Sequence, residues 1–215
     1  MFTHTHTIVP KLKSAHENNK HFYEINGIKY PSITTILHSF PNKNIEIWKA
    51  RTPNWREIQK ESLDVGTELH FMIESYLKNN YIPLGDRAGF TSVLFQNLRP
   101  ELDKINNIQC IETYLYEPNL RVAGCTDCIA EYDGEKCIID FKNSRRKKYD
   151  KYIIDYKLQL TAYSKMFEYC TKQKINTGVV IIANWDNTTS VFKVNIPDYE
   201  DQLLDVLEQY EMLTM

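Results

Sequence analysis

The sequence lacks any apolar run that approaches the length of a membrane span. Its N-terminal residues also lack the charged-then-apolar pattern of a secretory signal. No arginine precedes Arg51, which argues against an Arg-rich organellar transit peptide. From these absences we expect a cytoplasmic protein with no membrane partner.

Cysteine is scarce and odd in number, because the chain of 215 residues has only five. No disulfide framework is evident, so a reducing compartment fits best. Cys125 and Cys128 have the C-x-x-C spacing, but a zinc site or an iron–sulfur cluster normally needs four ligands, and no second close pair exists. On a strand the two thiols would point to opposite faces, which favours small buried residues over the alternative of a thiol redox site.

The chain also lacks an excess of charge of either sign, since its formal net charge is −2. Any attraction to nucleic acid must therefore come from a local basic patch. Residues 142–151 form such a patch, with six basic residues against one acidic residue. Two interpretations stay open for it, a solvated loop and a phosphate-binding segment.

What the sequence does contain is a strong hairpin signal, because an Asp-Gly pair at 133–134 divides two strand-like segments within residues 122–142. A two-residue turn would place Asp127 directly opposite Asp140, with their Cβ atoms roughly 5 Å apart. At an effective dielectric constant of ~20, their repulsion would be on the order of 3 kcal/mol. A divalent cation between the carboxylates would offset it, and Lys142 would stand beside that ion on the same face. The alternative interpretation is a solvated strand face that carries scattered charges.

Periodicity predicts that the remaining elements belong to a single α/β domain. We expect residues 1–24 to form a frayed terminus, followed by a small hairpin that turns at 26–27. Residues 31–100 should be mostly helical and form a cap. Residues 108–196 should form the sheet core, and residues 198–213 should form a terminal helix.

The longest predicted helix carries several possible site residues. Gly66 interrupts it at a cost of about 1 kcal/mol relative to alanine, so we expect it to allow close backbone approach. His70 and Glu74 share its face, although each could be an ordinary residue at the edge of the apolar stripe. Glu112, on a predicted strand, is either solvent-facing or a further carboxylate near the site.

Four short motifs follow one another along the chain. They are Gly66-Thr67-Glu68-Leu69-His70, Gly124-Cys125-Thr126-Asp127, Asp140-Phe141-Lys142 and Gln159-Leu160-Thr161-Ala162-Tyr163. Their order resembles that of the PD-(D/E)XK nuclease superfamily, and within it the RecB-like branch. The segments 30–34, 47–49 and 140–144 are also similar to the mitochondrial genome maintenance exonuclease group and its phage relatives. Asn143 stands where that group would have threonine.

The resemblance implies an α/β fold with a restriction-endonuclease-like αβββαβ core, a mixed central sheet and an added helical cap. It implies a DNA exonuclease that hydrolyses phosphodiester bonds with a metal-activated water at the ends of single-stranded DNA. The missing transit signal favours a phage or bacterial setting over a mitochondrial one. The cysteines do not match the iron–sulfur cluster of some relatives, so no such cluster is expected.

The resemblance also implies roles for individual residues. Mg²⁺ or Mn²⁺ would be bound by Asp127, Asp140 and the backbone carbonyl of Phe141, with His70 as a ligand or beside one. Lys142 would position the attacking water and the scissile phosphate. The implied catalytic set is His70, Asp127, Asp140, Lys142, Gln159 and Tyr163. The candidates for contact with DNA are Ser144, Arg145, Arg146, Lys147, Lys148, Lys49 and Arg51.

Several alternatives stay open. The chain could be a non-catalytic DNA- or protein-binding module on the same fold, or a metal-dependent phosphoesterase that acts on RNA or on small phosphate esters. Gln159 and Tyr163 could belong to an ordinary amphipathic helix. Trp48 and Trp55 could stack on bases, but core packing is the favoured interpretation for both.

Overall fold

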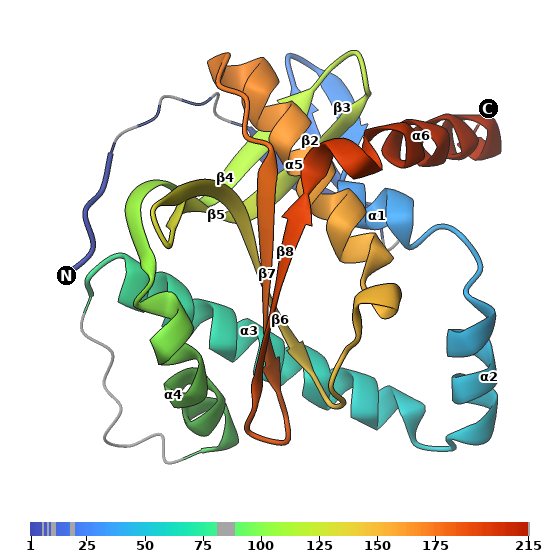
Figure 1. Ribbon diagram of the computed structural model, residues 1–215. Helices are drawn as coiled ribbons and strands as arrows, with labels where there is room; N and C mark the ends of the chain where they lie inside the picture. Colours follow the sequence, from blue (N-terminus) through green and yellow to red (C-terminus); the bar gives the residue numbers. More distant parts are fainter. Residues whose placement is uncertain (6, 8, 10–11, 18–19, 81–88, 215) are drawn as a thin grey trace.

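The computed structural model describes residues 1–5, 7, 9, 12–17, 20–80 and 89–214 of the chain. Within these residues it contains a five-stranded sheet with helices on both faces and a separate three-stranded sheet (Figure 1). None of the described helices combines the length and the apolar character that a membrane crossing requires.

The strands of the larger sheet follow chain order from one edge to the other. They are β4 (Ile105–Glu117), β5 (Val122–Tyr132), β6 (Glu135–Ser144), β7 (Thr177–Asn184) and β8 (Thr189–Asn195). β6 and β7 are parallel, and all other neighbours are antiparallel. A parallel pair needs a crossover, and α5 (Ile154–Thr171) provides it.

A layer of helices covers each face of this sheet. On one face, α5 shares a buried cluster with α1 (Ile33–Leu37) and α6 (Glu200–Thr214). On the other face, α3 (Trp55–Leu77) and α4 (Phe90–Leu102) share a second cluster with the sheet. The result is a mixed α/β fold with an αβββαβ core, so the expected fold class is confirmed.

The helices expected to form a cap do not behave alike. α3 and α4 bury apolar residues directly against the sheet, so they form a layer of the core. α2 (Lys43–Arg51), in contrast, buries no residue, although the side chain of Asn42 caps its first turn by accepting from two backbone N–H groups. Of the described helices in this region, α2 best fits the idea of an added element (Figure 1).

The central hairpin has the predicted turn and register. Asp133 and Gly134 both have positive φ, at 51° and 81°, as a two-residue turn of the primed type requires. The pairs run from Tyr132 opposite Glu135 to Cys128 opposite Ile139 without a shift. The local chemistry of two residues thus fixes which side chains meet farther along both strands.

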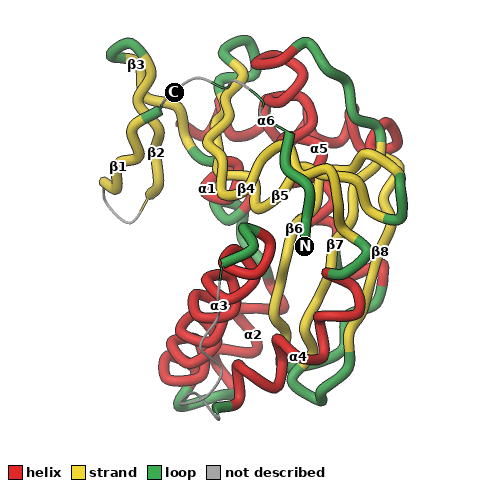
Figure 2. Tube along the Cα trace, turned by 90° about the vertical axis from the view of Figure 1, so that its left-hand side faces the viewer, coloured by secondary structure: helices red, strands yellow, loops and turns green. Residues whose placement is uncertain are grey.

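The expectation of a frayed N-terminus is wrong for much of the segment. The strands β1 (Lys13–Glu17), β2 (Lys20–Ile25) and β3 (Ile28–Pro31) form the smaller sheet, which lies away from α3 and α4 (Figure 2). The predicted turn at 26–27 is confirmed. β1 was missed because its order comes from pairing with β2, not from a periodicity of its own.

Candidate active site

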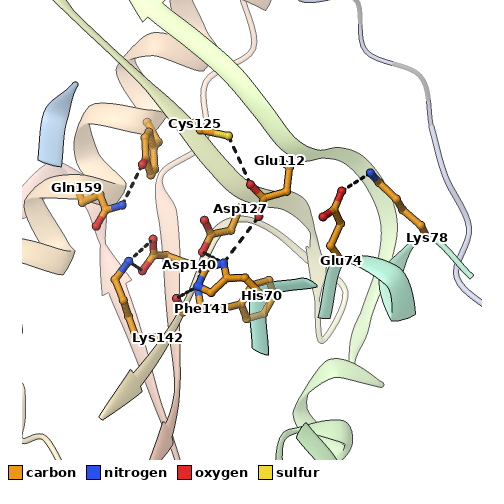
Figure 3. A network of polar contacts seen from close by, with 11 residues as sticks. His70, Glu74, Lys78, Glu112, Cys125, Asp127, Asp140, Phe141, Lys142 and Gln159 are labelled. Atoms are coloured by element: carbon orange, nitrogen blue, oxygen red, sulfur yellow. Dashed lines mark hydrogen bonds and ion pairs between the residues drawn. The ribbon is translucent and has the colours of Figure 1, made fainter. Parts of the chain in front are cut away.

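The candidate site lies where β5 and β6 separate. Their regular pairing ends at Cys128 and Ile139, and the next residues along the two strands are Asp127 and Asp140. Instead of continuing the ladder, Asp127 Oδ2 accepts a hydrogen bond of 2.8 Å from the backbone N–H of Phe141 (Figure 3). The predicted register therefore brings both aspartates to the fork between the strands.

Asp140 is completely buried and forms an ion pair with Lys142. The Nζ atom of Lys142 lies 2.8 Å from Oδ1 and 2.6 Å from Oδ2 of Asp140. Oδ2 receives no hydrogen bond of good geometry from the described residues. Burial raises the pKa of Asp140 against the opposing effect of Lys142. Burial alone would lower the pKa of Lys142, but the charges of Asp140 and Asp127 outweigh it and raise this pKa, so the lysine stays protonated.

His70 reaches the fork from α3, on the opposite side of the sheet from α5. Its Nε2 lies 2.9 Å from the carbonyl oxygen of Phe141, while its Nδ1 lies 3.7 Å from Glu112 Oε1 and 3.8 Å from Asp127 Oδ2 (Figure 3). Burial disfavours the imidazolium, but the charge of Asp127 and the contact with Glu112 outweigh it and raise the pKa of His70 to about 9. At neutral pH His70 is therefore cationic and bridges a carbonyl and two carboxylates.

Glu112 completes a row of three carboxylates on three neighbouring strands. The β4–β5 pairs on either side place it directly opposite Asp127. Its φ of 45° lies in the left-handed region, which is strained for a non-glycine residue within a strand. The sequence left its position open. The strand register could have located it, but a shift between Asn106 and Cys110 displaces the pairing of β4 with β5.

The residues at the fork fit a divalent cation. His70, Glu112 and Asp127 each offer a ligand atom, and these atoms lie within 4.8 Å of one another. The Phe141 carbonyl oxygen is adjacent, since His70 contacts it. Carboxylate and carbonyl oxygens with one imidazole suit Mn²⁺ or Mg²⁺. Asp140, which the sequence also predicted as a ligand, is not one of these three residues; its buried Oδ2 lacks a well-aligned donor.

Gln159 and Tyr163 lie on α5, behind the fork. Gln159 Nε2 donates a hydrogen bond of 2.9 Å to the Tyr163 hydroxyl, and both side chains are buried. A Cβ atom at Gly124 would come within 2.7 Å of Cε1 of the Tyr163 ring. The glycine therefore makes room for the ring, and the burial of the pair favours a supporting role over contact with DNA.

Gly66 allows α3 to approach β6 next to Lys142. A Cβ atom at Gly66 would come within 2.8 Å of Nδ2 of Asn143. The Asn143 amide donates to the Ser62 carbonyl at 3.3 Å and accepts from Trp185 Nε1 at 3.1 Å. The close contact at Gly66 is thus made by the end of a side chain and not by backbone, and Asn143 joins α3 to the strand that carries the lysine.

The residues proposed to contact DNA differ in their surroundings. Arg145 is held against α3 by Ser62 and Glu61, and its guanidinium lies 3.9 Å from the centre of the Trp185 ring. Ser144 is nearly buried, and its hydroxyl donates to the Arg146 carbonyl at 2.7 Å, so it stabilises the turn. The other candidates are exposed or half-buried and form no ion pair within the described residues: Arg146, Lys147, Lys148, Lys49 and Arg51.

The two tryptophans at the start of the helical region are not core residues. Trp48 is 39% exposed on α2, so the interpretation of core packing is wrong for it. Trp55 is half-buried between two cations, with Lys49 Nζ at 4.6 Å and the guanidinium of Arg56 at 4.7 Å from the ring centre. Of the two rings, the one with measured cation contacts is that of Trp55.

The thiols do not support a redox site. Cys125 donates a weak hydrogen bond of 3.6 Å to Glu112, whereas Cys128 lies in the buried cluster on the α3 side. Burial raises the pKa of both thiols, which disfavours the thiolate that such chemistry needs. Both cysteines are free.

The fold and the site together define a mixed α/β protein with a carboxylate–lysine centre at a fork between strands, consistent with a PD-(D/E)XK-like nuclease relationship. The curated homologues of the chain are mitochondrial genome maintenance exonuclease 1 proteins. The one from Homo sapiens is 24% identical over 172 residues, covering 74% of this chain and 50% of the human protein. The one from Mus musculus is 25% identical over 171 residues, covering 74% of this chain and 51% of the mouse protein. The one from Xenopus tropicalis is 26% identical over 172 residues, covering 74% of this chain and 49% of the frog protein.

The chain thus spans about half the length of the curated relatives it matches. No protein-family model matches it. Among solved structures, the crystal structure of SSO0001 aligns with 76% of this chain and 68% of its own, at 20% identity and a TM-score of 0.45.

Proposed function

We propose that this chain is a metal-dependent deoxyribonuclease of the PD-(D/E)XK type that removes nucleotides from the ends of single-stranded DNA. The observation that carries the proposal is the ion pair between the buried Asp140 and Lys142, beside Asp127 at the fork of β5 and β6. The names of the curated homologues, which are exonucleases, support the same class of reaction.

The proposed ligands of the ion are Asp127, Asp140, the Phe141 carbonyl and His70, to which we add Glu112. When bound, a Mg²⁺ or Mn²⁺ ion would polarise a phosphodiester and lower the pKa of a water. His70 contacts both the carbonyl and the carboxylates, so its imidazolium must lose a proton before the ring can bind a cation.

Lys142 has a more specific part in this proposal than the sequence suggested. Its raised pKa makes it a poor general base, because it stays protonated at neutral pH. Its side chain is partly exposed at 22%, while that of Asp140 is inaccessible. The ammonium can therefore donate to a phosphate oxygen and stabilise the charge that develops there.

The test uses end-labelled linear single-stranded DNA, with a duplex and a circular single strand in parallel. Each is incubated with Mg²⁺, Mn²⁺ or EDTA. Wild type should degrade only the linear single strand and only with metal, and Asp140→Asn and Lys142→Ala should abolish this activity. Lys165→Ala is the matched control, because Lys165 forms an ion pair of 2.6 Å with Glu200 on the α5–α6 side. The proposal would be refuted if wild type were inactive, or if Asp140→Asn or Lys142→Ala still degraded the linear single strand.

A further inference from the structure

The segment between β6 and α5 presents two aromatic rings to solvent. Tyr149 is 62% exposed and Tyr152 is 60% exposed, and they are the most exposed aromatic residues in the described part of the chain. A tyrosine usually buries its apolar ring and leaves only its hydroxyl in water. Two rings this exposed within one short segment form a surface available to a ligand.

The charge around these rings is strongly positive. Arg146, Lys147 and Lys148 precede Tyr149, and Lys151 Nζ lies 4.9 Å from the centre of the Tyr152 ring. The one acidic residue of the segment, Asp150, is already paired with the buried Lys157 at 2.7 Å. The segment therefore attracts a polyanion. A partner that also has flat apolar groups would use the rings.

The segment is held in place at both ends. Arg145 binds α3 through Ser62 Oγ at 3.1 Å, next to the turn at Ser144. At the other end, Asp150 is tied to α5 by its ion pair of 2.7 Å with the buried Lys157. A ligand would therefore meet a largely preformed surface, which lowers the entropy lost on binding.

Tyr149 and Tyr152 follow Lys142 by seven and ten residues in the sequence. The ring centre of Tyr156, in the first turn of α5, is 5.3 Å from Lys142 Nζ. Tyr152 lies four residues earlier, so its Cα is at most about 14 Å from that of Tyr156. A strand whose phosphate meets Lys142 would bring bases a few nucleotides away within reach of Tyr152.

We propose that Tyr149 and Tyr152 form a stacking platform for unpaired bases of the DNA strand held at Lys142. The inference rests on the proposed function and adds the residues that select single-stranded DNA. Unpaired bases expose their faces to an aromatic ring, whereas bases in a duplex already stack on one another. The basic residues hold the backbone of either form, so the preference for a single strand comes from the two tyrosines.

The test measures binding without cleavage, in Asp140→Asn and again in wild type with EDTA. Dissociation constants are measured by fluorescence anisotropy for a single-stranded oligonucleotide and for the same strand with abasic sites in place of its bases. Tyr149→Ala and Tyr152→Ala should each weaken binding of the base-bearing strand about 5-fold or more and leave binding of the abasic strand unchanged. The Tyr→Phe variants should bind both strands like the parent.

Lys147→Ala is the matched control, because it removes a backbone contact and keeps both rings. It should weaken binding to both strands and reduce the dependence of log K on log salt by about 0.7. The platform would be overturned if the Tyr→Ala variants bound the base-bearing strand as tightly as the parent protein, or if they lost the same affinity for both strands. It would also be overturned if the parent protein bound neither strand. The proposed function is tested separately by cleavage. It fails if wild type with metal cleaves no DNA, whatever the binding measurements show for the two tyrosines.

Discussion

Replacing Lys142 by methionine should destabilise the metal-free protein in a way that depends on Asp140. The substitution keeps most of the apolar stem and removes the charge that lies 2.6 Å from a carboxylate with no exposed surface. Asp127 at the same fork adds a second negative charge. Breaking a buried ion pair by removing one partner costs about 3–5 kcal/mol, because the other charge is left uncompensated.

The effect should depend on pH with a defined sign. In Lys142→Met, burial and Asp127 hold the pKa of Asp140 above its unfolded value, and the opposing effect of the lysine is gone. The folded state then binds more protons than the unfolded state, so stability falls as pH rises, by up to about 1.4 kcal/mol per pH unit. The deficit relative to wild type should be small near pH 4 and full at neutral pH.

The assay is urea denaturation at 25 °C in EDTA, at several pH values, with a full double-mutant cycle. Asp140→Asn with Lys142→Met should recover most of the loss, because no charge is then left buried. Lys165→Met, which breaks a more exposed pair with Glu200, should cost about 1 kcal/mol or less. The coupling argued for this pair would be refuted if Lys142→Met were as stable as wild type. It would also be refuted if the loss of stability at pH 4 equalled the loss at neutral pH, and the double variant lost as much stability as Lys142→Met alone.

Three further predictions concern the surroundings of this pair. In EDTA and below the unfolded-state pKa of ~6.5, wild type should be about 1–2 kcal/mol more stable than His70→Gln, allowing for solvent screening. This difference should vanish as pH rises through about 9, where the imidazolium of the folded protein loses its proton. A difference that urea titrations find unchanged at pH 10 would contradict the assigned imidazolium. Glu112→Gln should weaken Mn²⁺ binding about 10-fold in calorimetry, and unchanged affinity would remove Glu112 from the proposed ligands. Gly124→Ala should cost about 1–3 kcal/mol of unfolding free energy, because its methyl group meets the Tyr163 ring. Gly89→Ala should cost less, because a Cβ atom there has nothing within 4 Å. Equal losses in the two variants would refute the packing argument.

Part of the site follows from local chemistry, and that part could be predicted. The Asp-Gly turn at 133–134 requires positive φ at both residues, and this turn alone sets the register that brings Asp127 and Asp140 to the same level. Strand alternation then places Lys142 on the face of Asp140. Helical periodicity placed His70 on a long helix, although it did not show what the ring contacts.

Other features depend on pairings between distant segments, which the sequence does not fix. Glu112 reaches the site only because β4 and β5 pair in a register displaced by an irregularity near Asn106. Asn143 could not be identified as a link, because its partners Ser62 and Trp185 lie far from it in the chain.

The sequence by itself determined the turns, the helix faces and the order of the motifs, since each depends on neighbouring residues. Only the tertiary structure decided that Asp140 is buried against Lys142, that His70 bridges the Phe141 carbonyl and the carboxylates, and that Trp48 lies outside the core. Burial and the distance between charges are set by the packing of two helical layers on one sheet. These two quantities control the pKa values, and with them the chemistry proposed for the fork between β5 and β6.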